Sequence, residues 1–175
     1  MEKLVNMWDY CVPESVLDER GPVNVEAWIR ERGLSWRLID TGGPTTSVAD
    51  AAERLGVEPG VIVKTLVLID GEKTYAVIVP GPARLDLGKL ARVVGGKPRM
   101  ARPREVLERT GYRVGGVPPV ALPEDVVLVV DKAVLGLERV YGGGGRDGVL
   151  LEFSPAELVR ETGCLVADVS SSRIA

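Results

Sequence analysis

Histidine is absent from this chain of 175 residues, and cysteine occurs only twice. Without histidine there is no imidazole base, no Ser-His-Asp triad and no zinc site of the usual kind. The two thiols, Cys11 and Cys164, form no metal-ligand spacing. Any chemistry must therefore use Lys, Asp, Glu, Tyr, Ser or Thr side chains, backbone groups or the substrate itself, and we expect no metal and no cofactor.

Long apolar runs are missing too. No window is apolar enough to cross a bilayer, and the start of the chain leads into Trp8 and Tyr10 instead of an apolar core with a small-residue cleavage site. We therefore expect a cytoplasmic protein without a signal peptide and without a membrane partner. The length predicts one domain over residues 23–175, preceded by an N-terminal extension, residues 1–22, that packs on the body.

Charge is distributed unevenly along the chain. The net charge of −3 argues against a nucleic-acid partner, but residues 84–113 hold nine basic and three acidic residues and carry +6, which leaves −9 for the rest. The basic residues are Arg84, Lys89, Arg92, Lys97, Arg99, Arg102, Arg104, Arg109 and Arg113. Such a segment suits a polyanion docked at one place. It suits equally well a pair of solvated helices with arginine-rich outer faces, and the sequence does not decide between the two.

Residues 61–69 form the stretch around which the chain is organised. They are rich in β-branched residues, apolar on both faces and followed by Asp70 and Gly71, which predicts a strand buried on both sides. Lys64 lies in the middle of this strand. Burying an ammonium group without partners costs several kcal/mol, so this lysine requires a reason. It either serves a site or extends from an edge strand into water, and this stretch alone leaves both open.

Periodicity and capping residues predict the other elements. Helices are expected to begin at Asn24, Ser47, Asp86, Pro103 and Ser154. Strands are expected at residues 36–40, 74–79, 99–100, 126–130, 138–141, 149–153 and 165–169. Asp70 and Gly71 indicate a tight hairpin turn, which places two adjacent antiparallel strands at the centre of a sheet. Asp131 is expected to cap a short helix.

Two glycine-rich loops are candidate ligand sites. In residues 111–119, glycines let the backbone approach a ligand while two prolines stiffen the loop into a rigid wall. Residues 142–145 are all glycine, but they lack the Gly-Lys-Ser/Thr ending of a phosphate loop and join two strands. We therefore favour a flexible hairpin tip, with backbone contacts to a phosphate or sugar left open. Tyr75 and Tyr112 can stack on a base or fill the core, and the core is the default.

Three stretches of the chain, taken together, resemble one family. They are residues 63–68, residues 111–119 and residues 151–158, and the helix of residues 47–56, which comes before the first of them, matches as well. In this combination the chain resembles the YbaK/ProX family, free-standing relatives of the editing domain of bacterial prolyl-tRNA synthetases, over roughly residues 24–170. The resemblance implies an α/β fold of the α+β type, with a strongly curved, mostly antiparallel mixed sheet or barrel surrounded by helices.

The resemblance also implies an activity and a site. Family members hydrolyse the ester that joins a wrong amino acid to the 3′-terminal adenosine of a tRNA, here of the Cys-tRNA(Pro) type or with a related small amino acid. Lys64 and Gly115 are the implied catalytic residues. The implied substrate-binding residues are Thr65, Tyr112, Gly116, Val117, Pro118, Pro119, Gly143 and Gly144. Contacts to the tRNA backbone are assigned to Arg99, Arg102 and Arg104, and the expected partners are tRNA and prolyl-tRNA synthetase, with the chain a monomer or homodimer.

The chain departs from the family pattern at two places. Bacterial members often carry a serine opposite Gly143 and an aspartate near Leu150, so those roles are not carried over. The alanine-directed branch commonly has Lys-Asn where this chain has Lys64 and Thr65, together with a histidine, so alanyl specificity is disfavoured. Two other functions remain: a non-catalytic module that binds tRNA or a synthetase, and a nucleotide-binding protein that uses the glycine loop.

Overall fold

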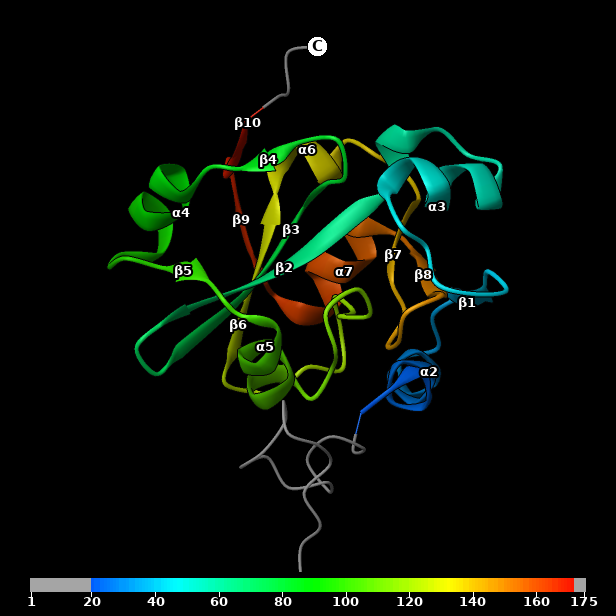
Figure 1. Ribbon diagram of the computed structural model, residues 1–175, viewed down its shortest axis with the longest axis horizontal. Coiled ribbons are helices and arrows are strands. Elements are labelled where there is room, and N and C mark those ends of the chain that lie inside the picture. The colour runs from blue at the N-terminus through cyan, green and yellow to red at the C-terminus, as the bar shows by residue number, and fades with distance from the viewer. Residues whose placement is uncertain (1–19, 172–175) are drawn as a thin grey trace, which may run out of the picture.

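The computed structural model describes residues 20–171, and its centre is a mixed sheet of five strands (Figure 1). The strand order is β5-β2-β3-β6-β9, with β2 and β3 in the middle. The strands are β2 (Val63–Asp70), β3 (Lys73–Pro80), β5 (Arg99–Met100), β6 (Val126–Asp131) and β9 (Leu165–Ala167). The predicted hairpin is confirmed, because β2 and β3 pair antiparallel up to Asp70 and Lys73, and Gly71 takes the positive φ of +60° that the turn requires.

Two smaller sheets complete the fold. One has the order β1-β8-β7, formed by β1 (Arg37–Asp40), β7 (Val140–Gly143) and β8 (Val149–Phe153), and the other pairs β4 (Arg84–Leu85) with β10 (Ser170–Ser171). A bridge between Ile62 and Tyr141 connects β7 to the start of β2. The pairs β3–β6 and β6–β9 are parallel and the other strand pairs are antiparallel, so the predicted curved, mostly antiparallel mixed sheet is confirmed.

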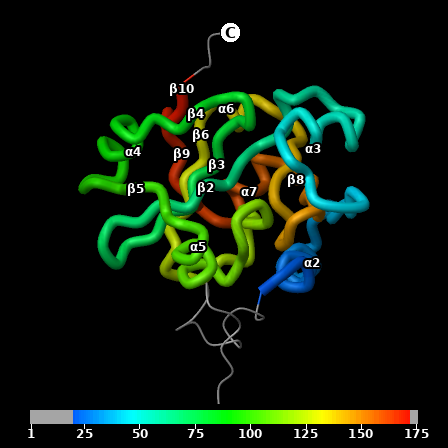
Figure 2. The backbone as a smooth tube through the Cα atoms, in the orientation of Figure 1, coloured from blue at the N-terminus to red at the C-terminus, as the bar shows by residue number. Residues whose placement is uncertain are grey.

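Helices surround these sheets, as the tube drawing in Figure 2 shows. They are α2 (Pro22–Glu31), α3 (Val48–Leu55), the 3-10 turn η1 (Pro59–Val61), α4 (Leu87–Val94), α5 (Pro103–Thr110), α6 (Lys132–Leu135) and α7 (Pro155–Thr162). The side chains of Ser47, Asp86 and Ser154 accept the backbone N–H of the third helical residue, as predicted. Asn24 was expected to begin its helix, but α2 begins at Pro22 and the Asn24 side chain accepts the Gly21 N–H at 2.9 Å instead.

The lysine strand differs from the prediction of burial on both faces. Residues 67–69 are buried, but Lys64, Thr65 and Leu66 are only half-buried. The reason is the shortness of β5, which covers β2 only at Leu68 and Ile69. Other strand ends shift as well: β7 begins at Val140 and includes two of the glycines expected to form a flexible tip.

The limits of the description leave some expectations open. The predicted N-terminal extension lies outside the described residues up to residue 19, as does Cys11, so the domain boundary stays a prediction. Within the described part of the chain, no helix has the length and apolar character needed to cross a membrane.

Asp131 ties the end of the chain to the central sheet. Its side chain is 1% exposed and caps α6 by accepting the Ala133 N–H at 3.3 Å, which confirms the predicted cap. It also accepts the N–H groups of Val169 at 2.9 Å and Ser170 at 3.2 Å, and the Ser170 hydroxyl at 2.8 Å. One carboxylate therefore satisfies four donors from two segments.

We predict that Asp131→Ala lowers the free energy of unfolding by about 3 kcal/mol, because several donors lose their acceptor at a buried position. Denaturant titration measures this change. The exposed Asp125→Ala variant is the matched control and should stay within about 0.5 kcal/mol of the parent chain. Equal stability of the two variants would contradict the assigned role of Asp131.

Candidate active site

An opening in the sheet lies along one edge of β2. The other edge pairs with β3 over its whole length. On the open edge, β7 pairs only through the Ile62–Tyr141 bridge, just before β2 begins, and β5 pairs only with Leu68 and Ile69. Between these two contacts no described strand pairs with residues 64–66. Residues 64–66, which alternate between the two faces of the strand, are only half-buried there, which is uncommon in the middle of a hydrophobic strand.

A cleft of about 320 Å³ fills this opening. Four segments line it: the start of α3 with the loop before it, the first half of β2, the loop after α5, and the facing pair of β7 and β8. The lining residues are Thr45, Thr46, Ser47, Val48, Ala51, Ile62, Val63, Lys64, Thr65, Leu66, Val114, Gly115, Val117, Gly142, Gly143 and Leu150. Lys64 is the one ionisable side chain in this set. The described lining therefore offers one cation, several hydroxyl groups and much apolar surface, without a carboxylate.

The side chains of Lys64 and Thr65 point to opposite faces of β2. Both residues line the same cleft, because no strand covers this edge of β2. The Lys64 ammonium group donates to the carbonyl oxygen of Ala83 at 2.9 Å, so the side chain is held at the end of its stem. The Thr65 hydroxyl is buried and has no hydrogen-bond partner among the described residues. A buried hydroxyl without a partner is costly, by about 1–3 kcal/mol, and such groups concentrate at binding sites.

Glycines bring the loop after α5 against the β7–β8 hairpin. A Cβ atom on Gly143 would overlap the carbonyl oxygen of Val117, and one on Gly116 would lie 2.6 Å from the Cα atom of Arg146. The Gly145 N–H donates to the Gly116 carbonyl at 2.9 Å and fixes this contact. The glycine run is therefore close-packed at one wall of the cleft, and the flexible tip expected from the sequence is wrong for Gly143 and its neighbours.

The structure brings together five of the predicted site residues. Lys64, Thr65, Gly115, Val117 and Gly143 all line the cleft, although they come from three separate segments of the chain. Gly115 is exposed at the cleft, whereas Val117 is buried beneath it. The glycine-proline loop thus presents its first part to the cleft and uses its second part for packing.

The other predicted substrate-binding residues lie outside the cleft lining. Gly116, Pro118 and Gly144 are buried behind it, and Pro119 lines a different hollow near Trp28.

Tyr112 is also placed in the core, where it is 1% exposed and donates to the Ala121 carbonyl at 2.8 Å. Burial raises the pKa of Tyr112 to about 12. It packs with Val67, Val106 and Val117, so its contribution to the site is to support the loop from below.

Sequence reasoning missed the hydroxyl-rich segment before α3. Thr45, Thr46 and Ser47 line the cleft, and only the capping role of Ser47 was predicted. Three consecutive hydroxyl residues at a helix start were the available signal, but it was explained by the cap alone. Val114 was missed as well: it is 56% exposed at the cleft, which is unusual for a large apolar side chain.

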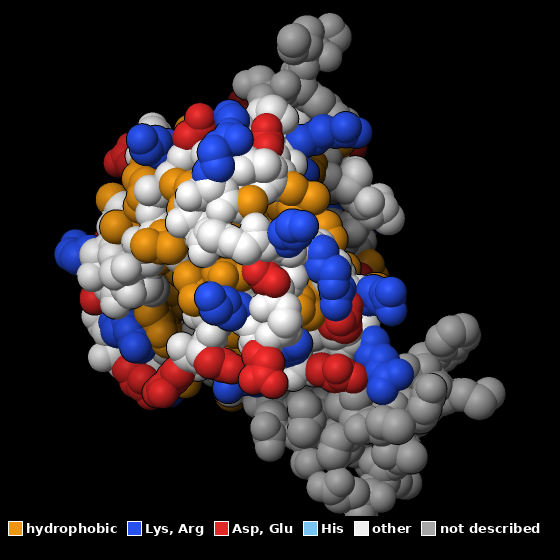
Figure 3. All heavy atoms as spheres, turned by 90° about the vertical axis from the view of Figure 1, so that its left-hand side faces the viewer, with side chains coloured by type: hydrophobic (Ala, Val, Ile, Leu, Met, Phe, Trp, Pro, Cys, Tyr) orange, Lys and Arg blue, Asp and Glu red, His pale blue; other side chains and the backbone are white. Residues whose placement is uncertain are grey.

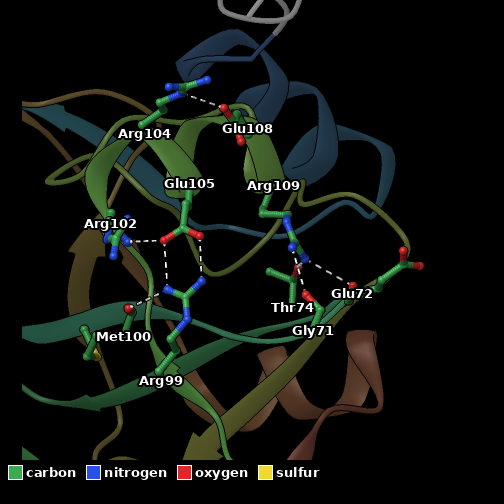
Figure 4. A network of polar contacts seen from close by, with 10 residues as sticks. All are labelled: Gly71, Glu72, Thr74, Arg99, Met100, Arg102, Arg104, Glu105, Glu108 and Arg109. Atoms are coloured by element: carbon green, nitrogen blue, oxygen red, sulfur yellow. Dashed lines mark hydrogen bonds and ion pairs between the residues drawn. The ribbon is translucent and has the colours of Figure 1, made fainter. Parts of the chain in front are cut away.

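Two arginines of the basic segment pair with carboxylates of the same segment. Arg99 of β5 donates to both carboxylate oxygens of Glu105 on α5, at 2.9 and 2.7 Å, and Arg104 donates to Glu108 at 2.9 Å (Figure 4). Figure 3 shows basic and acidic side chains interleaved with hydrophobic ones on the side of the molecule that carries α4 and β5. Of the three arginines assigned to tRNA contacts, only Arg102 has an exposed side chain that forms no ion pair with a described residue.

Arg109 has a structural role in the same network. Its guanidinium group donates to the carbonyl oxygens of Gly71 at 2.9 Å and Glu72 at 3.1 Å, and to the Thr74 hydroxyl at 2.9 Å (Figure 4). α5 is thereby fastened to the β2–β3 turn at one end, while Glu105 fastens it to β5. These contacts position the loop that follows α5, which forms the cleft wall.

We predict that Glu105 gives the stability of the protein a specific acid dependence. The hydrogen bond from Arg99, aided by the Arg102 N–H, lowers the pKa of Glu105 from 4.5 to about 2. A carboxyl whose pKa is lower in the folded chain stabilises that chain above the unfolded pKa of 4.5, and this stabilisation is lost as the pH falls towards 2. Because Arg99 is 53% exposed, screening limits the effect to about 1 kcal/mol.

Denaturant titrations of the parent chain and Glu105→Gln between about pH 6 and pH 2 test this expectation. The variant should be less stable at pH 6, and the difference should shrink as the solution is acidified. Glu161→Gln serves as the control, since Glu161 lies on α7, away from the contact between Arg99 and Glu105. A difference that stays constant with pH would contradict the assignment.

Comparison with known proteins places the chain in a family. The model of the family described as "Aminoacyl-tRNA editing domain" matches residues 43–161. That match begins just before α3, ends within α7 and includes all four segments that line the cleft.

Curated relatives share the domain. "Uncharacterized protein YwhH" of Bacillus subtilis is 33% identical over 132 residues, which are 75% of this chain and 82% of that protein. "Putative Cys-tRNA(Pro)/Cys-tRNA(Cys) deacylase EbsC" of Enterococcus faecalis is 30% identical over 128 residues, 71% of this chain and 77% of that protein. "Proline--tRNA ligase" of Thermotoga maritima is 36% identical over 109 residues, 62% of this chain but 18% of the ligase.

Solved structures agree with this result. "Crystal structure of hypothetical protein APE2540" has 54% identity and a TM-score of 0.81 and covers 85% of this chain and 99% of its own. "Crystal structure of a putative trans-editing enzyme for prolyl tRNA synthetase" has 37% identity and a TM-score of 0.79 and covers 86% of this chain and 97% of its own. With a matching fold, a matching sequence model and the cleft inside the matched region, the chain belongs to the aminoacyl-tRNA editing domain family.

Proposed function

We propose that this chain is a trans-editing enzyme that hydrolyses the ester bond of a mischarged aminoacyl-tRNA. The observation that carries the proposal is the position of Lys64, a half-buried cation at the uncovered edge of a hydrophobic strand, inside a cleft that a glycine-rich loop closes from the other side. The Ala83 carbonyl holds the Lys64 ammonium group there, so its positive charge is placed to meet a negatively charged or polarised ligand. The family of the chain supplies the ligand class, the 3′-aminoacyl end of a tRNA.

The chemistry suits a cleft without a protein base. Water adds to the ester carbonyl carbon, the bond to the ribose 3′-oxygen breaks, and that oxygen leaves with a proton, which gives free amino acid and tRNA. An aminoacyl ester is already activated, so the protein must chiefly position it and stabilise the developing oxyanion. In this proposal the Lys64 ammonium group supplies the positive charge, and the neighbouring ribose 2′-hydroxyl helps to activate the water.

Two further groups of the cleft are proposed to orient the ester. The Thr65 hydroxyl is buried without a described partner, so a polar atom of the substrate would satisfy it. Gly115, with a φ of +91°, exposes its backbone at the cleft while the rest of its loop is packed. Gly115 is thus suited to contact the ester through backbone groups that no side chain shields.

The far wall of the cleft favours a small amino acid. Gly143 and Leu150 face each other across the β7–β8 pair. Val48, Val63 and Val117, from the other three segments, add apolar surface to the cleft. We therefore propose a substrate of the Cys-tRNA(Pro) type, or one with another small side chain of low polarity, since apolar surface surrounds the place for the side chain.

The remaining partners follow from the same proposal. Free-standing editing would act on tRNA charged wrongly by prolyl-tRNA synthetase, whose Thermotoga maritima form contains a region similar to this chain. Arg102 is proposed as a contact to the tRNA backbone because its side chain is exposed and free of described ion pairs. For Arg99 and Arg104 such contacts would first require their bonds to Glu105 and Glu108 to open.

We predict that Lys64→Ala lowers the hydrolysis of mischarged tRNA by at least about 100-fold in kcat, because the main stabilising charge at the oxyanion is lost. The assay uses tRNAs charged with Cys, Ala, Ser, Thr and Pro. Lys73→Ala, an exposed lysine at the opposite end of the same hairpin, is the matched control and should retain full activity. Circular dichroism and thermal unfolding verify that both variants fold.

Two results would overturn the proposal. Wild-type turnover by a folded Lys64→Ala variant would remove Lys64 from the mechanism. Binding of the charged tRNAs by the parent chain without hydrolysis of any of them would favour a non-catalytic module that captures tRNA, and binding of free nucleotide without tRNA affinity would favour a nucleotide-binding protein.

A further inference from the structure

A second hollow lies on the other side of Lys64. Its volume is about 430 Å³, and it shares Ser47, Val48 and Lys64 with the cleft. The complete lining is Ser47, Val48, Ala49, Pro59, Lys64, Gly81, Pro82, Ala83 and Arg84. These residues come from α3, the start of β2 and the chain leading into β4, which lie together towards the upper right of Figure 1. Lys64 thus forms part of the wall between two adjacent hollows.

The charge of this hollow has one sign. Lys64 and Arg84 are its two ionisable lining residues, and the described lining contains no carboxylate. Arg84 is exposed and forms no ion pair with any described residue, unlike Arg99, Arg104 and Lys89 elsewhere in the basic segment. Two cations that share a concave surface raise the local concentration of anions and repel each other without one.

The shape of the hollow is well defined, because a rigid turn over residues 80–83 forms its floor. Pro80 and Pro82 restrict the backbone of residues 80–83, and the Ala83 N–H donates to the Pro80 carbonyl at 3.0 Å. The Gly81 N–H donates to the Ile62 carbonyl at 2.7 Å, and a Cβ atom on Gly81 would lie 2.9 Å from both methyl groups of Val48. The turn is therefore locked to β2 and to α3 by a contact that only glycine allows.

The same turn aligns the two cations. The Ala83 carbonyl accepts the Lys64 ammonium group at 2.9 Å, and Arg84 is the next residue, held in β4 by pairing with Ser171. This fixes the lysine head beside the start of the arginine side chain. Arginine suits a phosphate in such a position because its planar group donates two parallel hydrogen bonds.

The first turn of α3 adds to this environment. Ser47, Val48 and Ala49, at the start of the helix, line the hollow, and helix N-termini favour anions. The nearby carboxylate of Asp50 is engaged elsewhere, by the Thr46 N–H at 2.9 Å and by Arg54 at 3.1 Å, contacts that lower the pKa of Asp50. Its charge is therefore largely compensated within α3.

We propose that this hollow binds the phosphodiester group that precedes the 3′-terminal nucleotide of the substrate, with Arg84 as its principal binding residue. The inference rests on the proposed function, since it assumes that the cleft holds the aminoacyl ester. In a charged RNA end, a single ribose separates the ester from that phosphodiester. The cleft and the hollow are adjacent and share Lys64 in their linings, which matches this short spacing. A contact to the phosphate would fix how far the RNA end enters the cleft.

The test compares a substrate that has this phosphodiester with one that lacks it. We expect Arg84→Ala to lower kcat/KM for the mischarged tRNA about tenfold relative to kcat/KM for the corresponding aminoacyl-adenosine, mainly through KM. Arg84→Lys should recover part of this ratio because it keeps the charge but loses the paired hydrogen bonds. Arg92→Ala, an exposed arginine on α4, is the matched control and should keep the parent ratio.

A second measurement is independent of turnover. The binding constant K of an RNA minihelix that carries the tRNA acceptor end but no amino acid is measured at several salt concentrations. The slope of log K against log salt should become shallower by about one unit in Arg84→Ala and should not change in Arg92→Ala. Equal ratios and equal slopes for the two variants would overturn the phosphate assignment. If the parent chain hydrolyses neither substrate, the proposed function fails, and the minihelix titration still decides whether Arg84 contacts the RNA backbone.

Discussion

The incomplete coverage of one β-strand edge is the constraint on which the rest of this structure depends. β3 pairs with one edge of β2 over its whole length, but β7 and β5 pair with the other edge only near its two ends. A fully paired edge would bury residues 64–66 and exclude a charged side chain, because an ammonium group cannot remain inside a closed hydrophobic sheet at acceptable cost. The opening makes Lys64 tolerable and at the same time creates the cleft that it lines.

Close backbone contacts then turn this opening into a defined site. Gly143 lies against the Val117 carbonyl and Gly116 against the backbone of Arg146, so the loop wall has no room to relax toward the hairpin. Any side chain at position 143 would overlap that carbonyl, so the glycine and the present loop position depend on each other. With glycine at this position, the polar side chains in the cleft lining come from β2 and from the segment at the start of α3.

The sequence allowed prediction of the features that depend on interactions between residues close together in the chain. The caps at Ser47, Asp86 and Ser154, the turn at Gly71 and the unusual position of Lys64 depend on residues a few places apart, and all of them are found in the structure. Which part of a loop faces the ligand depends on distant contacts that no spacing encodes. Tyr112 and Pro118 were therefore assigned to the site although they support it from the core, and the pairing of Arg99 with Glu105 was not anticipated within the basic segment.

The cations of this chain fall into two groups: those that protein groups engage, and those that are exposed to a ligand. Arg99, Arg104, Arg109 and Lys89 bind carboxylates or carbonyl groups and hold α4, α5 and the strands in place. Arg84 and Arg102 have no such partners among the described residues, and Lys64 lies between two hollows. The segment charge of +6 already counts the carboxylates of Glu105 and Glu108, and several of its cations are held in place by protein contacts. Recognition by such a surface must depend on a few placed cations more than on a general field, since screening weakens distant charges and spares close contacts.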